Sequence, residues 1–543
     1  MSSSEVAAAM SMVQQLLSAV RQQVPVVDKV LTSAGDCSVS EYLQQICEVS
    51  QQSYQPRSDV AEVIYEYLAP LLGEQLAERS AADFLQHPVA LTTNHHGVDF
   101  FAQSVQGSLL FGLAKRRIEG VTTIPVFSCA NIPLDNLTYP RGALLYACHT
   151  DDGSWPLRVP LFTNKYRRQL VARVKGLDRS MLEQAAKRLD GISVAGINPL
   201  LSETLRNLLL SEYQADDVLS QNSYAAQSVI LNQRIWNRLF CSSATMPELV
   251  TIELERLAEG LLLKDLLNPS SLISVLFTKP LIVALYQQLD SVSGCWSPSM
   301  LEQRWASRAA AEQLRTSGCG TFCFWGVDSR SRRIPLMLND QLGAPILSGC
   351  DDNGTEYHYS LDPDALAVAL NTGQLIPSVF SCFLVIALAR GVTCLGGYYQ
   401  AAYLPQMQAG VTEVLQRYDQ AQLAEVISTS VTDGYLSGMQ TIMVAEGDTL
   451  LPAGLLEILG SGAITAAELE LISNTTLHDA HVASLAETVA DVMPHSGLDE
   501  NWQRQLSTEQ RSLLSAKIVL RYLGQCHSVL NGCIKENNIP VTV

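Results

Sequence analysis

Charged side chains are scarce in this sequence. Asp, Glu, Lys and Arg make up 17% of its 543 residues, against about 25% in ordinary soluble proteins. Hydrophobic residues reach 47%, which is enough for a packed interior and excludes a disordered chain. A chain of this length normally divides into about two or three domains. Because few charges are available to cover the surface, we also expect a partner on some apolar surface, for instance in a homodimer.

Positive charge is scarcer than negative charge. The chain has 36 Lys and Arg residues against 54 Asp and Glu residues, which gives a net charge of −18. A surface of this sign repels phosphate backbones, so we expect no nucleic acid as the main ligand.

Long hydrophobic runs are also absent. The most apolar stretch, residues 375–389, contains Pro377 and several Ser and Cys residues, and it falls short of the roughly 20 residues that a membrane-spanning helix needs. The N-terminus has helical apolar spacing and lacks the pattern of a signal peptide. The 13 cysteines show no repeated spacing, which favours buried thiols over a disulfide framework. We therefore expect a soluble, cytoplasmic protein without a membrane partner.

The familiar cofactor and catalytic motifs are missing too. Neither GxxxxGK[ST] nor GxGxxG occurs, and there is no GxSxG, HExxH or paired CxxC. No particular cofactor and no metal motif is therefore predicted. Two basic clusters remain, either as solvated turns or as sites for the phosphates of a nucleotide or coenzyme A: Lys165, Arg167 and Arg168, and then Arg330, Arg332 and Arg333.

Hydrophobic patterning divides the chain into five segments and predicts a mixed α/β fold. A βαβ-containing sheet core would have large helical segments before, between and after it. The predicted segments are an N-terminal helical cap over 1–86, an α/β core with the candidate site over 87–170, a helical region over 171–315, a second β-containing part of the core over 316–410, and a C-terminal helical region over 411–543.

The βαβ unit itself is expected between residues 89 and 129. A β-prone run over 89–93, a helical pattern over about 101–118 and a second β-prone run over 122–129 have its order. Further β-prone runs cover 143–148 and 157–162, and the apolar stripe over 249–267 predicts a helix with Glu253 and Glu255 on its polar side. Residues 321–338 predict two strands joined by a polar turn.

The densest set of reactive side chains follows the first expected strand. Asn94, His95, His96, Gly97 and Asp99 fall within six residues, just before the expected helix. Ligands of open α/β sheets bind outside the carboxyl ends of the strands, and helix amides favour anions there. Either histidine could act as a general base, with Asp99 orienting its ring and Asn94 donating to an oxyanion.

The spacing His95-x-x-x-Asp99 resembles a motif of acyltransferases that use His as the base and Asp as its structural partner. The chloramphenicol-acetyltransferase family has Gly after the Asp, where this chain has Phe100, and carries the motif much later in the chain. Glycerolipid acyltransferases have one more residue between His and Asp. The resemblance is one of role, and it implies acyl transfer.

Two other interpretations use the same residues. His95, His96 and Asp99, joined by His149 or His358, are suitable ligand types for zinc or iron. Alternatively, Asp99 caps the helix and the histidines bond to nearby loops.

A second polar loop, residues 131–142, follows the second expected strand. βαβ geometry would place this loop beside the turn of residues 94–99. Its side chains suit a small polar substrate, and its arginine could bind a carboxylate or phosphate through two hydrogen bonds. The predicted substrate contacts are Asn94, Asn131, Asp135, Asn136, Tyr139 and Arg141.

Three functions are therefore open. The first is a cytosolic enzyme for a small polar or anionic metabolite, with acyl-type group transfer and His95, His96 and Asp99 as catalytic residues. The second is a metal-dependent enzyme with these residues as ligands. The third is a non-enzymatic helical interaction protein.

Overall fold

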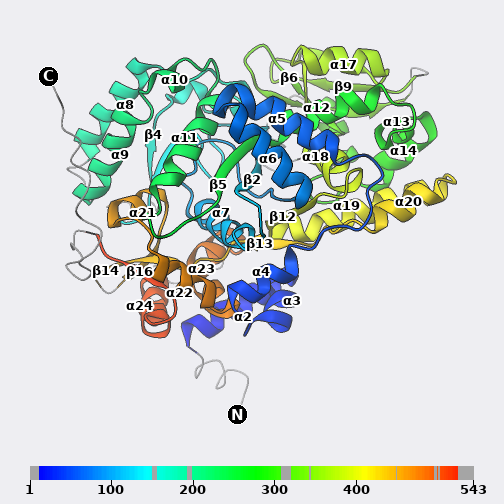
Figure 1. The fold of residues 1–543 in the computed structure, drawn as a ribbon. Helices are drawn as coiled ribbons and strands as arrows, with labels where there is room; N and C mark the ends of the chain where they lie inside the picture. The colour runs from blue at the N-terminus through cyan, green and yellow to red at the C-terminus, as the bar shows by residue number, and fades with distance from the viewer. Residues whose placement is uncertain are drawn as a thin grey trace.

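The computed structural model describes residues 11–148, 156–192, 198–306, 319–340, 344–447, 449–494, 498 and 502–523. Its centre is a five-stranded sheet surrounded by helices (Figure 1). The mixed α/β class predicted from the sequence is confirmed.

All five strands of the central sheet are parallel. Their spatial order is β13 (Tyr435–Ser437), β12 (Thr393–Gly397), β1 (Val89–Leu91), β2 (Thr123–Ser128) and β5 (Glu248–Glu253). The chain builds outward from β1 through β2 to β5, then returns to the other side of β1 and continues through β12 to β13. This order is that of a doubly wound sheet.

The βαβ unit is present as predicted. β1 and β2 are parallel neighbours, joined by α7 (Ala102–Lys115). A Cβ atom on Gly112 of α7 would lie 2.9 Å from Ile124 of β2, so a small residue is needed for this close approach. Phe127, three residues further along β2, packs on Phe84 of α6 (Glu74–Gln86) with ring centroids 5.9 Å apart. Because side chains alternate along a strand, α7 and α6 cover opposite faces of the sheet.

One helix prediction is wrong at its start. Residues 248–253 form the edge strand β5, and only then does α12 (Leu254–Leu266) begin. The β-branched residues Val250, Thr251 and Ile252 belong to a strand whose apolar run continues directly into the helix, and such a run hides the boundary. Glu253 and Glu255 are buried rather than on a polar face.

Among the described residues, four small sheets lie outside the central one. In the part of the chain that the structure describes, the expected strands over 143–148 and 157–162 pair with each other alone, as the antiparallel hairpin of β3 (Gly142–Leu145) and β4 (Leu157–Pro160). The expected hairpin over 321–338 is confirmed as the antiparallel pair β6 (Phe324–Val327) and β7 (Arg333–Pro335). The remaining strands of this part are β8 (Met337–Asn339), β9 (Ile346–Cys350), β10 (Glu356–Ser360) and β11 (Leu375–Pro377).

The C-terminal part is not wholly helical, which corrects the prediction for 411–543. It contains β13 of the central sheet and a three-stranded sheet. β14 (Ile442–Glu446) is its central strand, paired with β15 (Thr449–Pro452) and with β16 (Val519–Arg521). β15 follows β14 directly as an antiparallel hairpin, whereas β16 comes from a distant part of the chain, so local alternation cannot reveal the pairing of β14 with β16.

Helices fill the remaining layers. Before β1 lie α2 (Met12–Gln23), α3 (Pro25–Ala34), α4 (Val39–Ile46) and α5 (Ser58–Leu72); between β4 and β5 lie α8 (Arg179–Ile192), α9 (Pro199–Ser211), α10 (Asp216–Leu219) and α11 (Tyr224–Arg238). The others are α13 (Leu272–Leu276), α14 (Lys279–Gln288), α15 (Pro298–Ala306), α17 (Pro363–Asn371), α18 (Val379–Phe383), α19 (Tyr398–Arg417), α20 (Ala421–Ser428), α21 (Leu455–Ser461), α22 (Ala466–Asn474), α23 (Leu477–Val492) and α24 (Trp502–Leu514).

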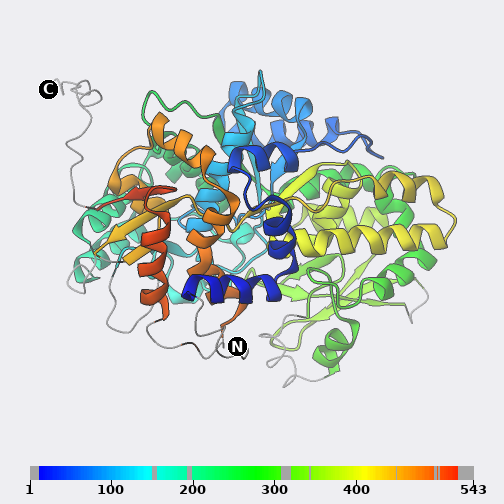
Figure 2. The ribbon, with the colours of Figure 1, turned by 90° about the horizontal axis from the view of Figure 1, so that it is seen from below.

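A second, smaller core lies at the bottom of the view in Figure 1. Apolar side chains of α2 and α3 pack there against α23, α24 and the β14 sheet, and Figure 2 shows α2 beside these C-terminal helices. The N-terminal helical segment is thus shared between two cores, since α5 and α6 cover the main sheet.

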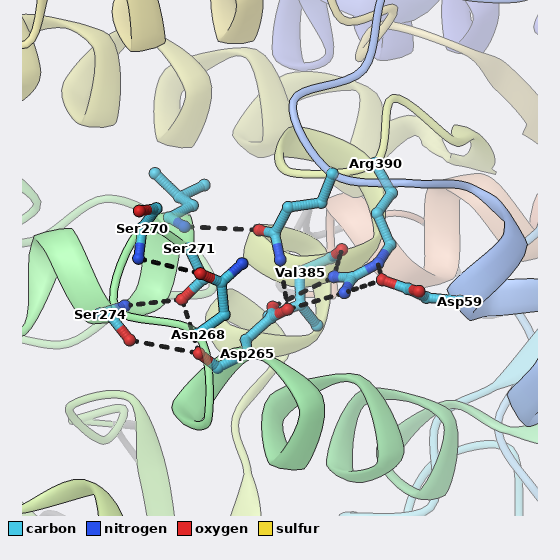
Figure 3. A network of polar contacts seen from close by, with 10 residues as sticks. Asp59, Asp265, Asn268, Ser270, Ser271, Ser274, Val385 and Arg390 are labelled. Carbon is cyan, nitrogen blue, oxygen red and sulfur yellow. Dashed lines mark hydrogen bonds and ion pairs between the residues drawn. The ribbon is translucent and has the colours of Figure 1, made fainter.

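A buried ion cluster ties the core together. The guanidinium of Arg390 is fully buried and bonds to Asp265 at 2.7 Å and to Asp59 at 2.8 Å (Figure 3). It also donates to the carbonyl oxygen of Val385 at 3.0 Å. Three segments, α5, α12 and the turn before β12, are joined by one side chain.

In the described part of the chain, no helix has the length and apolar character that crossing a membrane requires.

Candidate functional site

The turn that follows β1 lies at the carboxyl edge of the sheet. His95 extends the strand by a parallel bridge to Cys129, directly after β2. The backbone confirms this with two hydrogen bonds, from His96 to the Cys129 carbonyl at 2.8 Å and from Cys129 to the Asn94 carbonyl at 2.9 Å. The conspicuous cluster of polar residues is therefore held rigidly at the edge where α/β proteins bind ligands.

His95 is half-buried and has a defined partner on one side of its ring. Its Nδ1 lies 3.0 Å from Oγ1 of Thr138, and that hydroxyl lies 3.3 Å from Oδ1 of Asn136. If the hydroxyl donates to Asn136, it must accept from Nδ1, which puts the ring proton on Nδ1 and leaves the lone pair on Nε2. Burial, assisted by the charge of Arg333, lowers the pKa of His95 to about 4. The imidazole is therefore neutral at pH 7.

His96 is buried with both ring nitrogens engaged. Nδ1 lies 2.6 Å from Oγ of Ser128, and Nε2 lies 3.0 Å from the carbonyl oxygen of Ala225. The ring therefore ties β2 to α11. Burial lowers its pKa to about 4. A catalytic role for His96 stays a prediction, and this geometry gives it no free nitrogen.

The carboxylate of Asp99 has Asn94, and not a histidine, as its hydrogen-bond partner. Its carboxylate accepts a hydrogen bond of 2.7 Å from the amide of Asn94, which also donates to Ser108 at 3.1 Å. Burial raises the pKa of Asp99 to about 7. The N-cap of α7 is Phe101, without a side-chain cap. Within the described residues, no hydrogen bond joins Asp99 to His95 or His96.

Asn94 has an unusual feature of its own. Its Oδ1 is buried and has no hydrogen-bond partner in the described part of the protein. A cavity of about 20 Å³, which has room for about one water molecule, lies between Asp99, Ser108 and Asn232 and the apolar side chains behind them. Asn94 and Asp99 thus form a pair on α7's side of the turn, apart from His95.

The loop of residues 131–142 packs against the turn, as βαβ geometry predicts. Thr138 bonds to His95, and a Cβ atom on Gly97 would lie 3.1 Å from Pro140. Asn131 is buried; its amide donates to the carbonyl oxygen of Pro377 at 3.2 Å. The two polar segments therefore share one edge of the sheet.

The other predicted substrate-binding residues do not gather at one place. Asn136 supports Thr138, whereas Asp135 points to solvent 3.9 Å from Arg167. Tyr139 is buried with a left-handed φ of 56°, and the guanidinium of Arg158 lies over its ring. Arg141 donates to Phe162 at 2.9 Å and to Asn164 at 2.5 Å, so it holds the β3–β4 hairpin. Contact of these residues with a substrate stays a prediction.

A cavity of about 460 Å³ opens beside this edge. Volumes of about 300–1,000 Å³ are usual for small-molecule sites. Asn131, Ser378 and Arg333 supply polar groups to its wall, and Trp296 and Trp325 supply aromatic surface. The guanidinium of Arg333 lies 4.4 Å from the ring of Trp325 and donates to the carbonyl oxygen of Asn131 at 3.2 Å. His95 does not line this cavity, but the charge of Arg333 reaches it.

Two buried carboxylates lie behind the same edge. Glu255 accepts from the backbone of Ala130 at 2.7 Å and from the thiol of Cys129 at 3.2 Å. It thereby fixes the chain just after β2. Burial, with the neighbouring charge of Glu255, raises the pKa of Glu253 to about 8. The apolar spacing over 249–267 predicts a polar helix face for both residues, so neither was a predicted site residue.

Thr138 and Arg333 contribute to the site although they are not among the predicted site residues. Thr138 lies between predicted site residues, and a lone threonine carries no motif. Arg333 stands out in the sequence only as part of a basic cluster. Its place beside Asn131 depends on the β6–β7 hairpin folding onto the sheet edge, which no local pattern reveals.

The described residues contain no group of three or more His, Cys, Asp or Glu side chains placed to hold one metal ion. His95, His96 and Asp99 do not converge on a point, and His358 bonds to Ser348 on β9. His149 lies outside the described residues.

Comparisons with protein-family models, with curated proteins and with solved structures found no match to this chain.

Proposed function

We propose that the chain is an enzyme that acts on a small anionic metabolite by acyl-type group transfer, with His95 as the general base. The observation that carries this proposal is the His95–Thr138–Asn136 arrangement at the carboxyl edge of the sheet. A neutral imidazole with Nδ1 engaged has its lone pair on Nε2, which is the group that a general base needs.

Arg333 is the proposed anchor for the negative charge of the substrate. It lines the 460 Å³ cavity, and Trp325 and the Asn131 carbonyl hold its guanidinium in place. A planar guanidinium can bind a carboxylate or phosphate through two parallel hydrogen bonds. Asn131 and Ser378 supply further polar groups to the same wall.

Arg333 would also couple substrate binding to basicity. Burial is the main reason for the low pKa of His95, and the positive charge of Arg333 adds to it. An anion bound to Arg333 offsets that charge and raises the pKa of His95. The base would therefore gain strength when the substrate is bound.

In the proposed step, His95 carries the proton from the acceptor to the leaving group. Nε2 of His95 takes the proton from a hydroxyl or amine of the acceptor, whose lone pair forms a bond to the acyl carbon. The carbonyl π electrons move to oxygen. When the carbonyl re-forms, the bond to the leaving group breaks, and protonated His95 returns its proton to that group.

His95→Asn is the variant that tests the base. An Asn amide can keep a hydrogen bond to Thr138 but has no counterpart of Nε2. Purified wild-type and variant protein would each be incubated with a metabolite extract supplemented with acyl thioesters, and mass spectrometry would follow consumption and product formation. We expect the variant to lose about 10²–10⁴-fold of the rate without a change in thermal stability.

His478→Asn is the matched control, because His478 is exposed on α23, away from the site. We expect it to retain full activity. Equal activity of His95→Asn and wild type in a reaction that the protein demonstrably catalyses would overturn the assignment of the base.

The pH dependence tests the coupling. We expect an acid limb of kcat/KM near pH 4, from free His95, and an acid limb of kcat at higher pH, from the complex. Arg333→Met removes the positive charge, so it should raise KM and move the acid limb of kcat/KM to higher pH. Arg333→Lys keeps the charge, so its limb should stay close to that of wild type. A kcat limb at or below that of kcat/KM would contradict the coupling.

A homodimer, a cytoplasmic location and catalysis itself remain parts of this proposal. No conversion of any metabolite, with intact folding, would favour the third interpretation, a non-enzymatic interaction protein.

A further inference from the structure

The two basic clusters of the sequence meet in one groove. Lys165, Arg167 and Arg168 lie on and after the 3₁₀ turn Asn164–Tyr166, and Arg330 and Arg332 lie on the turn between β6 and β7. All five side chains line a single concave space of about 520 Å³, together with Asn164, Gln169 and Ser329. Clusters more than 150 residues apart in the chain therefore form one surface.

We propose that this groove binds the oligophosphate group of a small molecule, the chemistry shared by nucleoside di- and triphosphates and coenzyme A. This site goes beyond the proposed function, since it involves neither His95 nor the 460 Å³ cavity. Arginine and lysine side chains provide several N–H donors to phosphate oxygens, and charge-assisted hydrogen bonds of this kind are the strong ones.

Charge balance supports an anionic ligand. Asp352 pairs with Arg168 and, at 3.4 Å, with Arg332; Asp328 pairs with Arg332 at 3.5 Å. Arg304 also reaches Asp352, at 3.7 Å, and Asp135 lies 3.9 Å from Arg167. Among the described residues, no carboxylate pairs with Lys165 or Arg330. Three carboxylates thus face five lining cations.

The arginine-bearing turn is rigid before any ligand binds. One carboxylate oxygen of Asp328 accepts from the backbone of Arg330 and of Arg332, each at 2.8 Å. Ser331 between them has a φ of 60°, and its carbonyl oxygen accepts from Leu170 at 2.9 Å, which joins the two cationic segments. Because the backbone that carries the arginines is fixed beforehand, less backbone entropy is lost when a ligand binds.

The groove adjoins the candidate site. The backbone of Leu134 donates to the carbonyl of Gln169 at 3.0 Å, and that of Asp135 donates to Arg167 at 3.0 Å. The loop of residues 131–142 thus lies between His95 and the basic groove. Arg333, which lines the 460 Å³ cavity, directly follows Arg332 of the groove. A molecule with its phosphates in the groove can extend toward the sheet edge.

The dimensions and overall charge favour a small molecule over a nucleic acid. The groove has a volume of about 520 Å³ and lies in a chain with a net charge of −18. Outside the groove such a chain repels an extended phosphate backbone. A compact oligophosphate meets only the local positive field.

Isothermal titration calorimetry of the full chain tests the proposal with four probes: ATP, coenzyme A, inorganic tripolyphosphate and a single-stranded RNA 12-mer. We expect saturable binding of tripolyphosphate that weakens as salt is raised, and binding of ATP or coenzyme A at the same site by competition. Tighter binding of only one of the two identifies the source of the phosphates.

Lys165→Ala/Arg330→Ala is the informative variant, because neither side chain has a carboxylate that its removal would leave unpaired in the described structure. We expect the affinity for tripolyphosphate to fall roughly tenfold to a hundredfold, as charge-assisted hydrogen bonds are lost. The matched control is Lys187→Ala/Arg116→Ala, which removes the same two charges from exposed positions on α8 and just after α7. It should bind like wild type.

Equal weakening by the two double variants would show a non-specific charge effect and overturn the site. So would the absence of saturable binding of tripolyphosphate, ATP and coenzyme A at millimolar concentration. Preferential binding of the RNA would also overturn the proposal. His95→Asn should leave the affinity for tripolyphosphate unchanged, which separates this inference from the proposed base.

Discussion

Arginine is used in two opposite ways in this protein. In the core, the guanidinium of Arg390 is fully buried and is shared by the carboxylates of Asp265 and Asp59 (Figure 3). In the basic groove, five cationic side chains face an open space, and their three carboxylate partners do not neutralise them. In the first arrangement the guanidinium has its carboxylate partners, whereas in the second some cationic side chains have no carboxylate partner among the described residues.

The difference follows from solvation. A buried charge must find its full complement of partners inside the protein, because an unpaired one costs several kcal/mol. A charge at a groove keeps its water until a ligand replaces it. A surplus of cations is therefore tolerable only where solvent reaches them, and it marks a place where an anion can bind. Arg333 lies between these extremes, since it faces a cavity yet burial lowers its pKa.

The largest effect is expected from breaking the closed cluster. Arg390→Met leaves the carboxylate of Asp265 buried without its cation, and we expect a loss of about 3–5 kcal/mol in the free energy of unfolding. Arg330→Met in the groove should change it by less than about 0.5 kcal/mol. Urea denaturation of both variants measures the contrast, and a similar loss in both would remove the distinction between the two regions.

The pH dependence of stability provides a second test of how much a buried charge destabilises the core. Burial raises the pKa values of Glu253 and Glu487 to about 8 and that of Glu457 to about 7. The folded state therefore binds more protons than the unfolded state between pH 4.5 and 8, so these groups lose their stabilisation as pH rises. The free energy of unfolding should increase from pH 8 to 6.5 by on the order of 1 kcal/mol per pH unit for each group.

Buried histidines should stop this increase below pH 6.5. Burial is the main reason that the pKa values of four histidines are lowered to about 4: His87, His95, His96 and His481. The unfolded state therefore binds more protons than the folded state between pH 4 and 6.5. The contribution of these histidines to stability is lost as pH falls through this range. We expect a plateau there. A stability that falls steadily from pH 8 to 6.5 would contradict the assignment of the buried acids.

Glu253→Gln isolates one of these acids. One of its carboxylate oxygens is buried without a hydrogen-bond partner in the described structure, and the neutral amide avoids burying a charge. We expect the free energy of unfolding of the variant to exceed that of wild type by about 1 kcal/mol or more at pH 8. At pH 5 the two should differ little. Asp135→Asn at the exposed rim of the groove is the comparison and should show no such pH-dependent gain.

The smallest effect concerns Asp352, the carboxylate that the groove arginines share. Asp352→Asn keeps the shape but removes the charge, so the affinity for tripolyphosphate should rise by about fivefold, the equivalent of ~1 kcal/mol. Arg332 retains Asp328, but the nearly buried Arg304 loses its contact with the Asp352 charge, so we expect a modest loss of stability. Asp265→Asn in the core should instead destabilise the protein. Weaker phosphate binding by Asp352→Asn would mean that this carboxylate helps to form the site.

Local patterns predicted the parts of the fold that depend on neighbouring residues. The run before Asn94, the helix after it and the next strand have clear periodicity, so the βαβ unit and the place of the turn could be predicted. The start of α12 could not, because β5 joins the helix without a break in apolar character. β14 and β16 also escaped, since their pairing joins residues 442–444 to 519–521.

By itself the sequence determined the α/β class, the polar turn after β1 and the presence of two basic clusters in an acidic chain. Only the tertiary structure decided what these features contact. His95 bonds to Thr138, 43 residues further along the chain, while both ring nitrogens of His96 next to it are engaged by Ser128 and Ala225. The two basic clusters become one groove through contacts between distant segments, such as the bond between Leu170 and Ser331 and the carboxylate of Asp352 that Arg168 and Arg332 share. Such contacts depend on where distant segments meet, and they leave no periodic trace in the sequence.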